Sequence, residues 1–279
     1  INNVNRMKKF GVGFIEAKSG YGLDVETELK QLEALKEVKK DFPFIASTFM
    51  GAHDIPPGNE DKEKRKKDYI ELLTNELLKK VAENKLAKFC DVFVEEGYYT
   101  KEETKHIIKE AQKHGLKAKL HADEFTDQGA AELAVELKAV SADHLLCVSD
   151  KGIQALANSN TVATILPGTS FNLGLKYAPA KKLAEQGACI AIASDFNPGS
   201  NSGLNFQLML MIAITQNKLS VAQALCAGIY GGAKALEIEK DYGHLVKGSM
   251  AIFQVYDAND YNDIFYNYGE NRLKDLVFA

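Results

Sequence analysis

The chain has 279 residues, of which 46% are hydrophobic and 26% are charged, and its formal net charge is -4. This balance provides no broad basic surface for nucleic acid or anionic lipid, so we expect a small molecule as the partner. No run approaches the roughly 18 apolar residues of a membrane span, and the four cysteines form no C-x-x-C pair, which favours reduced thiols and a cytoplasmic location.

Short β-rich runs alternate along the chain with longer amphipathic helical patterns, as is typical of parallel βα units. We expect strands at 11–18, 43–50, 89–95, 116–121, 139–144, 161–166 and 189–195. We expect helices at 25–40, 66–84, 101–115 and 129–139, with two more near 205–216 and 220–236. Gly115 and Gly187 stand where helices should end before the next strand. The charge run at 60–68 alternates in sign and is expected to be a solvated helix face.

This rhythm predicts an α/β fold, a TIM-like (β/α)8 barrel over residues 1–236 that lacks one strand. Two smaller domains would also fit the length. The chain opens INNVNRMKKF, without an initiator methionine and within a helical pattern, so we expect the absent unit to be the first strand. Any targeting segment could have been lost with it. After this barrel the rhythm changes, and residues 237–279 are expected to form a small C-terminal β appendage.

Three segments place an acid or a histidine at the end of an apolar strand, namely KLHADEF at 119–125, SADHLL at 141–146 and ASDFNPGS at 193–200. The C-terminal ends of barrel strands meet at one mouth, so we expect His121, His144 and Asp195 to gather there. A histidine at one strand end is more often structural, but three independent strands favour function. Imidazole and carboxylate groups suit a divalent metal in a hydrolase, and His121 and Asp195 are the predicted ligands.

Other side chains near these strand ends are candidates for substrate contacts. Glu124 either reaches a bound substrate or acts as a first-turn acid of the next helix. His53 in GAHDIPP follows the second strand and should also face the mouth. The glycines of SGYGLD expose Tyr21, although this run is only a weak phosphate signal. In LPGTSF, Thr169 and Ser170 either cap a helix or bond a ligand.

The turn after Asp195 is rich in backbone donors that can hold a carboxylate or an amide. Its candidate residues are Asn197, Gly199 and Ser200. No P-loop and no G-x-S-x-G elbow occurs in the sequence, which disfavours nucleotide binding and a serine-hydrolase triad. The remaining histidines are most simply surface or structural residues: His106, His114 and His244.

Taken together, these motifs resemble the imidazolonepropionases, a family of the amidohydrolase superfamily. The resemblance runs along essentially the whole chain through SGYGLDVETELKQL, GAHDIPP, FCDVFVEEG, KLHADEF, SADHL, LPGTSF and SDFNPGS. It implies a homodimeric hydrolase of histidine degradation that opens the ring of 4-imidazolone-5-propanoate to give N-formimidoyl-L-glutamate. It also implies one zinc or iron ion, held by an H-x-H pair on strand one, by His121 and by Asp195.

The resemblance also assigns roles. Asp195 would carry a proton from water to the leaving ring nitrogen, His144 would stabilise the oxyanion, and Glu124 would act beside them. The implied substrate contacts are Tyr21, His53, Glu124, Asn197, Gly199 and Ser200. The chain contains no H-x-H pair and no counterpart of the family's arginine near strand one.

Three alternatives stay open at this point. A deaminase of the same superfamily would use the same strand-end residues and release ammonia. A non-catalytic binding or remnant protein would fit the missing metal ligands. A binuclear hydantoinase-type enzyme is less favoured, because it needs a bridging lysine where this chain reads DVFVEEG.

Overall fold

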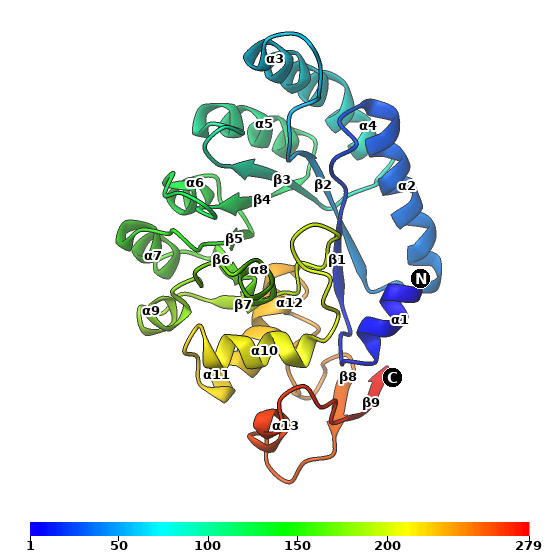
Figure 1. Ribbon diagram of the computed structural model, residues 1–279. Coiled ribbons are helices and arrows are strands. Elements are labelled where there is room, and N and C mark those ends of the chain that lie inside the picture. Colours follow the sequence, from blue (N-terminus) through cyan, green and yellow to red (C-terminus); the bar gives the residue numbers. More distant parts are fainter. Residues whose placement is uncertain (279) are drawn as a thin grey trace.

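A parallel sheet of seven strands, in the order β1 to β7, forms the centre of the computed structural model, which describes residues 1–278. The strands are β1 (Ile15–Lys18), β2 (Ile45–Ala52), β3 (Phe89–Val94), β4 (Lys117–Ala122), β5 (Ser141–His144), β6 (Val162–Ile165) and β7 (Ile190–Ile192). Each overlaps its predicted range. The sheet curls like part of a barrel wall, and helices cover its outer side (Figure 1). The predicted α/β fold is therefore confirmed, with seven barrel strands in the described residues.

The helices follow the strands in the expected alternation. Those up to β5 are α1 (Asn2–Lys8), α2 (Val25–Asp41), α3 (Lys62–Leu72), α4 (Leu78–Glu83), α5 (Lys101–Lys113) and α6 (Ala130–Glu136). Those after β5 are α7 (Asp150–Ala157), α8 (Pro167–Leu173), α9 (Ala180–Glu185), α10 (Phe206–Thr215), α11 (Val221–Cys226), α12 (Gly232–Ala235) and α13 (Asp263–Tyr266). Two π-helical turns, η1 (Leu73–Leu77) and η2 (Ala227–Gly231), interrupt helices that the sequence pattern predicts as continuous.

Local sequence signals explain several of these boundaries. Thr100 and Glu103 form a capping box at the start of α5, in which each side chain satisfies an otherwise unpaired backbone donor. Gly115 and Gly187 both adopt a positive φ, of 83° and 89° respectively. Such left-handed conformations end helices and favour glycine. The two predicted helix stops are therefore confirmed.

The apolar core lies between the sheet and its outer helices. Every residue of β3 is buried, and β2 and β4 are nearly as enclosed. Leu73, Leu77 and Leu78 from the η1 region pack into this layer with no exposed surface. Burial on both faces explains why most positions of β2 and β3 are apolar.

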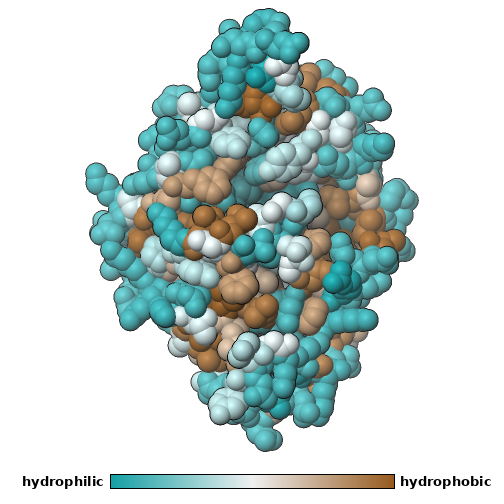
Figure 2. Space-filling view, viewed as in Figure 1, coloured by the Kyte–Doolittle hydropathy of each residue, from teal (hydrophilic) through white to brown (hydrophobic). Residues whose placement is uncertain are grey.

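The charge run at 60–68 lies mostly in solvent, as predicted. Most of α3 is exposed, and the top of the molecule, where α3 lies, is largely hydrophilic (Figure 2). Lys66 is the exception, because it is buried and pairs with Glu63 and Glu103 at 2.9 and 3.2 Å.

A two-stranded antiparallel sheet follows the barrel helices. It consists of β8 (Ile252–Tyr256) and β9 (Leu273–Phe278), and α13 lies between them, where the sequence analysis expected no helix. The sheet packs beneath the barrel (Figure 1). There, Gln254 donates a hydrogen bond to the Gly11 carbonyl at 2.6 Å, and the rings of Phe44 and Phe278 stack at 5.1 Å. None of the helices in the described residues is both long and apolar enough to cross a membrane.

Candidate active site

Charged side chains occupy alternate positions on four of the seven strands. They are Glu16 and Lys18 on β1, Asp91 on β3, Lys119 and His121 on β4, and Asp143 on β5. Residues two apart on a strand point to the same face of the sheet. The register places Asp91 beside Lys119, and His121 beside Asp143. Charges buried in this way must be paired if the fold is to be stable.

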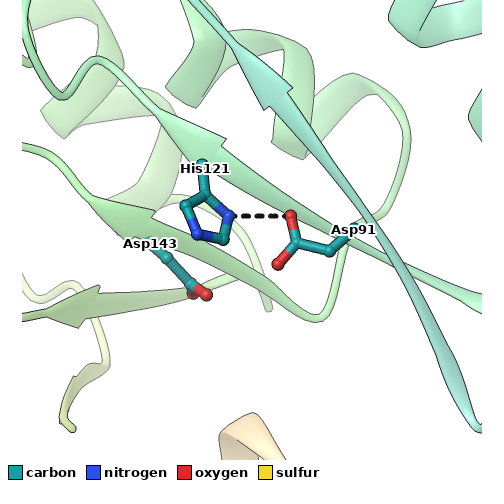
Figure 3. A group of neighbouring side chains, drawn as sticks. All are labelled: Asp91, His121 and Asp143. Atoms are coloured by element: carbon teal, nitrogen blue, oxygen red, sulfur yellow. Dashed lines mark hydrogen bonds and ion pairs between the residues drawn. The ribbon is translucent and has the colours of Figure 1, made fainter. Parts of the chain in front are cut away.

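Lys18 pairs two buried carboxylates. Its Nζ lies 2.5 Å from Oδ2 of Asp91 and 2.7 Å from Oδ2 of Asp143. The second oxygen of each carboxylate has its own partner, because Nδ1 of His121 lies 3.0 Å from Oδ1 of Asp91 (Figure 3) and the Ser141 hydroxyl donates to Oδ1 of Asp143 at 2.7 Å. All four carboxylate oxygens are thus satisfied by protein groups.

The pKa values of these groups follow from that pairing. Burial alone would raise the pKa of Asp91, but His121 and Lys18 outweigh burial and hold this pKa far below its ordinary value. Burial would likewise raise the pKa of Asp143, but the charges of Lys18 and Lys119 outweigh burial and lower this pKa to about 2. For Lys18, burial would lower the pKa, yet the facing carboxylates raise it well above its ordinary value. Lys18 is therefore a cation, and both aspartates are anions, across the neutral range.

Asp91, His121 and Asp143 also resemble a metal site, since one ligand atom from each lies within 4.8 Å of the others. However, Lys18 already places a positive charge between the two carboxylates. His121 is the member of the group that keeps a free ligand atom, because no residue among 1–278 hydrogen-bonds its Nε2. Asp195, the other predicted metal ligand, is outside this close group.

Aromatic rings line up across the strand ends beside this cluster. Successive ring centroids lie 4.8 Å apart for Tyr21 and His53, 5.1 Å for His53 and His121, and 5.0 Å for His121 and His144. Burial lowers the pKa of His53 to about 3 and that of His144 to about 4, so both rings are neutral at pH 7. Their Nδ1 atoms are buried without a hydrogen-bond partner in the described residues. Unpaired buried polar atoms are costly, and these two suit a bound polar ligand.

The loop that carries Glu124 is held on both sides by hydrogen bonds to carboxylates. Asp123 accepts hydrogen bonds from the amides of Ala130 and Ala131, each at 3.0 Å, so the capping role considered for Glu124 belongs to Asp123. Glu95, which follows β3, accepts hydrogen bonds from the amides of Phe125 and Thr126 at 2.8 and 3.2 Å, and these bonds hold the loop on the other side of Glu124. Burial raises the pKa of Glu124 to about 7, so its carboxyl changes protonation near neutral pH.

Asp195 follows β7 and is held by one residue of α8 and one residue of its own turn. Thr169 donates its hydroxyl to Oδ2 of Asp195 at 2.6 Å, and the Ser200 hydroxyl lies 3.4 Å from the same atom. The Asn197 side chain accepts from the amides of Gly199 and Ser200 at 2.8 and 2.6 Å. The turn predicted to contact substrate is therefore ordered around Asn197, and its two amides are engaged within the turn.

Several residues at the strand ends have a left-handed backbone. Tyr21 has a φ of 58°, His144 of 78° and Asp195 of 51°, and Asp123, beside Glu124, has a φ of 50°. For residues other than glycine this conformation costs about 1–2 kcal/mol. Such positions cluster at functional sites, where the surrounding structure maintains them.

Comparison with known proteins assigns the chain to a protein family. The amidohydrolase family model matches residues 25–278. The chain belongs to the amidohydrolase family. It is 42% identical over 275 residues to the imidazolonepropionase of Clostridium tetani, covering 98% of this chain and 65% of the relative. It is 40% identical over 277 residues to the imidazolonepropionase of Alkaliphilus oremlandii, with 99% and 65% covered. The chain thus spans slightly less than two thirds of the length of these curated relatives.

Solved structures of other proteins have the same fold as this amidohydrolase chain. The 5-methylcytosine deaminase of Klebsiella pneumoniae aligns with a TM-score of 0.78 at 16% identity, covering 99% of this chain and 72% of that one. A zinc-bound adenosine deaminase of Xanthomonas campestris aligns with a TM-score of 0.74 at 17% identity, covering 99% and 66%. At this level of sequence identity, the similarity shows a shared fold.

The amidohydrolase family is metal-dependent, and the surroundings of His121 fit a metal ligand. Nε2 of His121 is free, as described above, while Asp91 holds the other ring nitrogen. A histidine ligand in metal sites usually donates its second N–H to such a carboxylate. The neutral rings of His53 and His144 lie next to His121 and do not place further positive charge there at pH 7.

The sequence analysis did not single out Lys18, Asp91, Asp143 or Glu95 as site residues. A signal for the first three was present, because each is an ionisable residue inside or at the end of an apolar run predicted as a strand. A charge in a fully buried strand must have a partner. Glu95 follows β3 directly, so the strand-end criterion that selected His121 and Asp195 would also have selected Glu95.

Proposed function

We propose that this chain carries the active site of an imidazolonepropionase, which hydrolyses a ring C–N bond of 4-imidazolone-5-propanoate to give N-formimidoyl-L-glutamate. The similarity to imidazolonepropionases along 98–99% of the chain supports the choice of substrate. The observation that carries the proposal is the row of rings from Tyr21 to His144 across the strand ends, with Glu124 beside it. A homodimer and a cytoplasmic location belong to the proposal through the same resemblance.

His121 and Asp195 would hold a zinc or iron ion. Such an ion, when bound, supplies a Lewis acid and lowers the pKa of a bound water from 15.7 to about 7. Asp91 keeps the Nδ1 side of His121 occupied, so that Nε2 would be the atom that binds the ion. Thr169 holds one carboxylate oxygen of Asp195 at 2.6 Å and so orients the other one.

The side chains of this site can also move the protons that ring opening requires. Hydrolysis of the amide takes a proton from water and delivers one to the leaving ring nitrogen. Asp195 is the proposed carrier, and a positioned acid–base group of this kind contributes about 10² to 10⁴-fold to a rate. His144 is neutral at pH 7, so it can donate one N–H to the carbonyl oxygen as negative charge develops there.

Substrate binding would use the remaining members of the site. Glu124 titrates near neutrality and can hydrogen-bond an N–H or a ring oxygen according to its protonation. Tyr21 and His53 offer ring faces to a planar imidazolone. Asn197, Gly199 and Ser200 are the proposed contacts of the propionate. Binding there requires the amides now bonded to Asn197 to be shared with the substrate.

The direct test follows the loss of imidazolone ultraviolet absorbance after the chain is added. It is run with metal present, after a chelator, and after zinc or iron is added back. We expect metal-dependent loss of absorbance and formation of N-formimidoyl-L-glutamate without ammonia. Ammonia release would instead indicate a deaminase. Absorbance that stays constant with metal present would contradict the proposal, and binding of a substrate analogue without turnover would indicate a non-catalytic binding protein.

A further inference from the structure

We propose that Asp91 is a positioning residue that sets the ring tautomer of His121, and that Lys18 keeps Asp91 ionised and oriented so that it can do so. The inference rests on the proposed function in one respect, since that function takes His121 as a metal ligand. It concerns residues that lie deeper in the barrel than the proposed substrate contacts.

The geometry around Asp91 leaves no freedom in its hydrogen bonds. Its side chain is fully buried, with Nζ of Lys18 at 2.5 Å from Oδ2 and Nδ1 of His121 at 3.0 Å from Oδ1 (Figure 3). An ammonium group only donates hydrogen bonds, and an ionised carboxylate only accepts them. The proton between Asp91 and His121 must therefore be on Nδ1.

A neutral imidazole carries only one N–H. When that proton is on Nδ1, the lone pair is on Nε2, which is the atom that remains free of protein partners among residues 1–278. The opposite tautomer would set the Nδ1 lone pair against a carboxylate oxygen at 3.0 Å. Asp91 thus selects the form of His121 in which Nε2 can bind a metal ion.

Lys18 makes this selection testable by an isosteric change. In Asp91→Asn, the side chain has one acceptor and one NH₂ group. Lys18 can only donate, so the Asn carbonyl must turn to Lys18 and the NH₂ group must turn to His121. Nδ1 of His121 then has to accept, which moves the ring proton to Nε2.

Asp143 supplies a matched control. It is buried and pairs with the same Nζ of Lys18 at 2.7 Å, but its other hydrogen bond comes from Ser141. Asp143→Asn removes the same charge from the same lysine without replacing the hydrogen-bond acceptor of His121.

The experiment records ¹⁵N NMR shifts of the His121 ring in the metal-free protein, above the pH at which the ring becomes neutral. Zinc affinity is measured on the same samples. We expect the Nδ1–H form in the wild type and in Asp143→Asn, and the Nε2–H form in Asp91→Asn. Zinc should bind about 10- to 100-fold more weakly to Asp91→Asn and with unchanged affinity to Asp143→Asn.

A third variant addresses misfolding. In the double variant Lys18→Met with Asp91→Asn, the Asn side chain is released from the ammonium and can turn its carbonyl to His121, which should restore Nδ1–H. Circular dichroism checks that each variant is folded. An Nδ1–H ring in folded Asp91→Asn would overturn the inference. Loss of zinc binding in every protein, the wild type included, would instead contradict the metal site of the proposed function, while the ring shifts would still decide the role of Asp91.

Discussion

Nδ1 of His144 lies 3.3 Å from Oε1 of Glu124, yet this nitrogen makes no hydrogen bond within the described residues. The separation is short enough for an ion pair, but the orientation does not suit a shared proton. Burial lowers the pKa of His144 to about 4 and raises that of Glu124 to about 7. Burial thus moves both groups toward their neutral forms, and the contact joins a neutral imidazole to a carboxyl that titrates near pH 7.

The raised pKa of Glu124 predicts a pH dependence of stability. Its ordinary value is 4.5 and its value in the folded protein is about 7, so between these values the folded state binds more protons than the unfolded state. The contribution of Glu124 is therefore fully present below about pH 4.5 and is lost as pH rises through about 7. Glu124→Gln should remove this dependence, which amounts to about 3 kcal/mol.

The measurement is urea unfolding of both proteins in chelator at several pH values from 4.5 to about 7, the range between the ordinary and the raised pKa of Glu124. The variant should gain stability relative to the wild type as pH rises. Parallel pH profiles would show that the carboxyl is not held in its neutral form by burial.

His144→Ala should leave metal content unchanged while reducing turnover by about 10² to 10³-fold, the usual effect of removing one oxyanion donor. The readouts are bound metal by elemental analysis and kcat by imidazolone absorbance. His106, which is exposed on α5, provides the control, and His106→Ala should retain both values. Turnover that survives in His144→Ala would remove this histidine from the reaction.

Thr169→Val should reduce activity about 10- to 100-fold, because the lost hydroxyl orients the carboxylate of Asp195. Thr161→Val is matched to it, since Thr161 is also buried and donates its hydroxyl to the Ala139 carbonyl at 2.8 Å. Thr161 precedes β6 and so lies at the N-terminal end of that strand, opposite the candidate site. We expect a similar fall in thermal stability in both variants, but loss of kcat in Thr169→Val alone. Equal activities would mean that Thr169 serves only packing.

Glu95→Ala should loosen the loop after β4. The carboxylate of Glu95 binds the amides of Phe125 and Thr126, and bonds to a charged group contribute about 1.5–3 kcal/mol each. Hydrogen exchange at these two amides should accelerate, and KM should rise because Glu124 lies in the same loop. Glu96→Ala removes an exposed neighbouring carboxylate and should change neither. Unaltered exchange in Glu95→Ala would argue against the clamp.

Gly231→Ala should strongly destabilise the protein. A Cβ at this position in η2 would lie 1.9 Å from the Ile190 carbonyl oxygen of β7, whereas one at Gly232 would meet nothing within 4 Å. Overpacking costs about 1–3 kcal/mol even among side chains, while Gly→Ala at an open helical position stabilises by about 0.5–1 kcal/mol. Thermal melts of the two variants should therefore shift in opposite directions. A melt of Gly231→Ala at or above the wild-type temperature would show that η2 can move away from β7.

The fold could be predicted from the sequence because its signals are local. Apolar runs such as that of β3 are buried on both faces, and helix ends are marked by residues such as Gly115. The π-turns η1 and η2 could not be predicted, because they follow from tertiary contacts, such as that between Gly231 and β7. α13 was missed because its four residues are too few for a helical pattern.

The candidate site could be predicted from the sequence where an acid or a histidine stands at the end of an apolar strand pattern. His121, His144 and Glu124 were found on that basis, and the structure brings them together. The ion pairs inside the barrel could not be predicted in this way, because the pairing of Lys18 with Asp143 depends on the register of strands whose residues are 125 positions apart. That register comes from the whole sheet and from no local segment.

The left-handed backbone at the strand ends has a consequence for engineering this protein. A common way to stabilise a fold is to place glycine where another residue is held at positive φ, because glycine tolerates that conformation without strain. Here that search would select Lys85, Lys138 and Lys218 as well as Tyr21, His144 and Asp195. At the last three positions glycine would relax the backbone but erase a side chain of the proposed site, so gains in heat tolerance have to come from positions such as the three lysines.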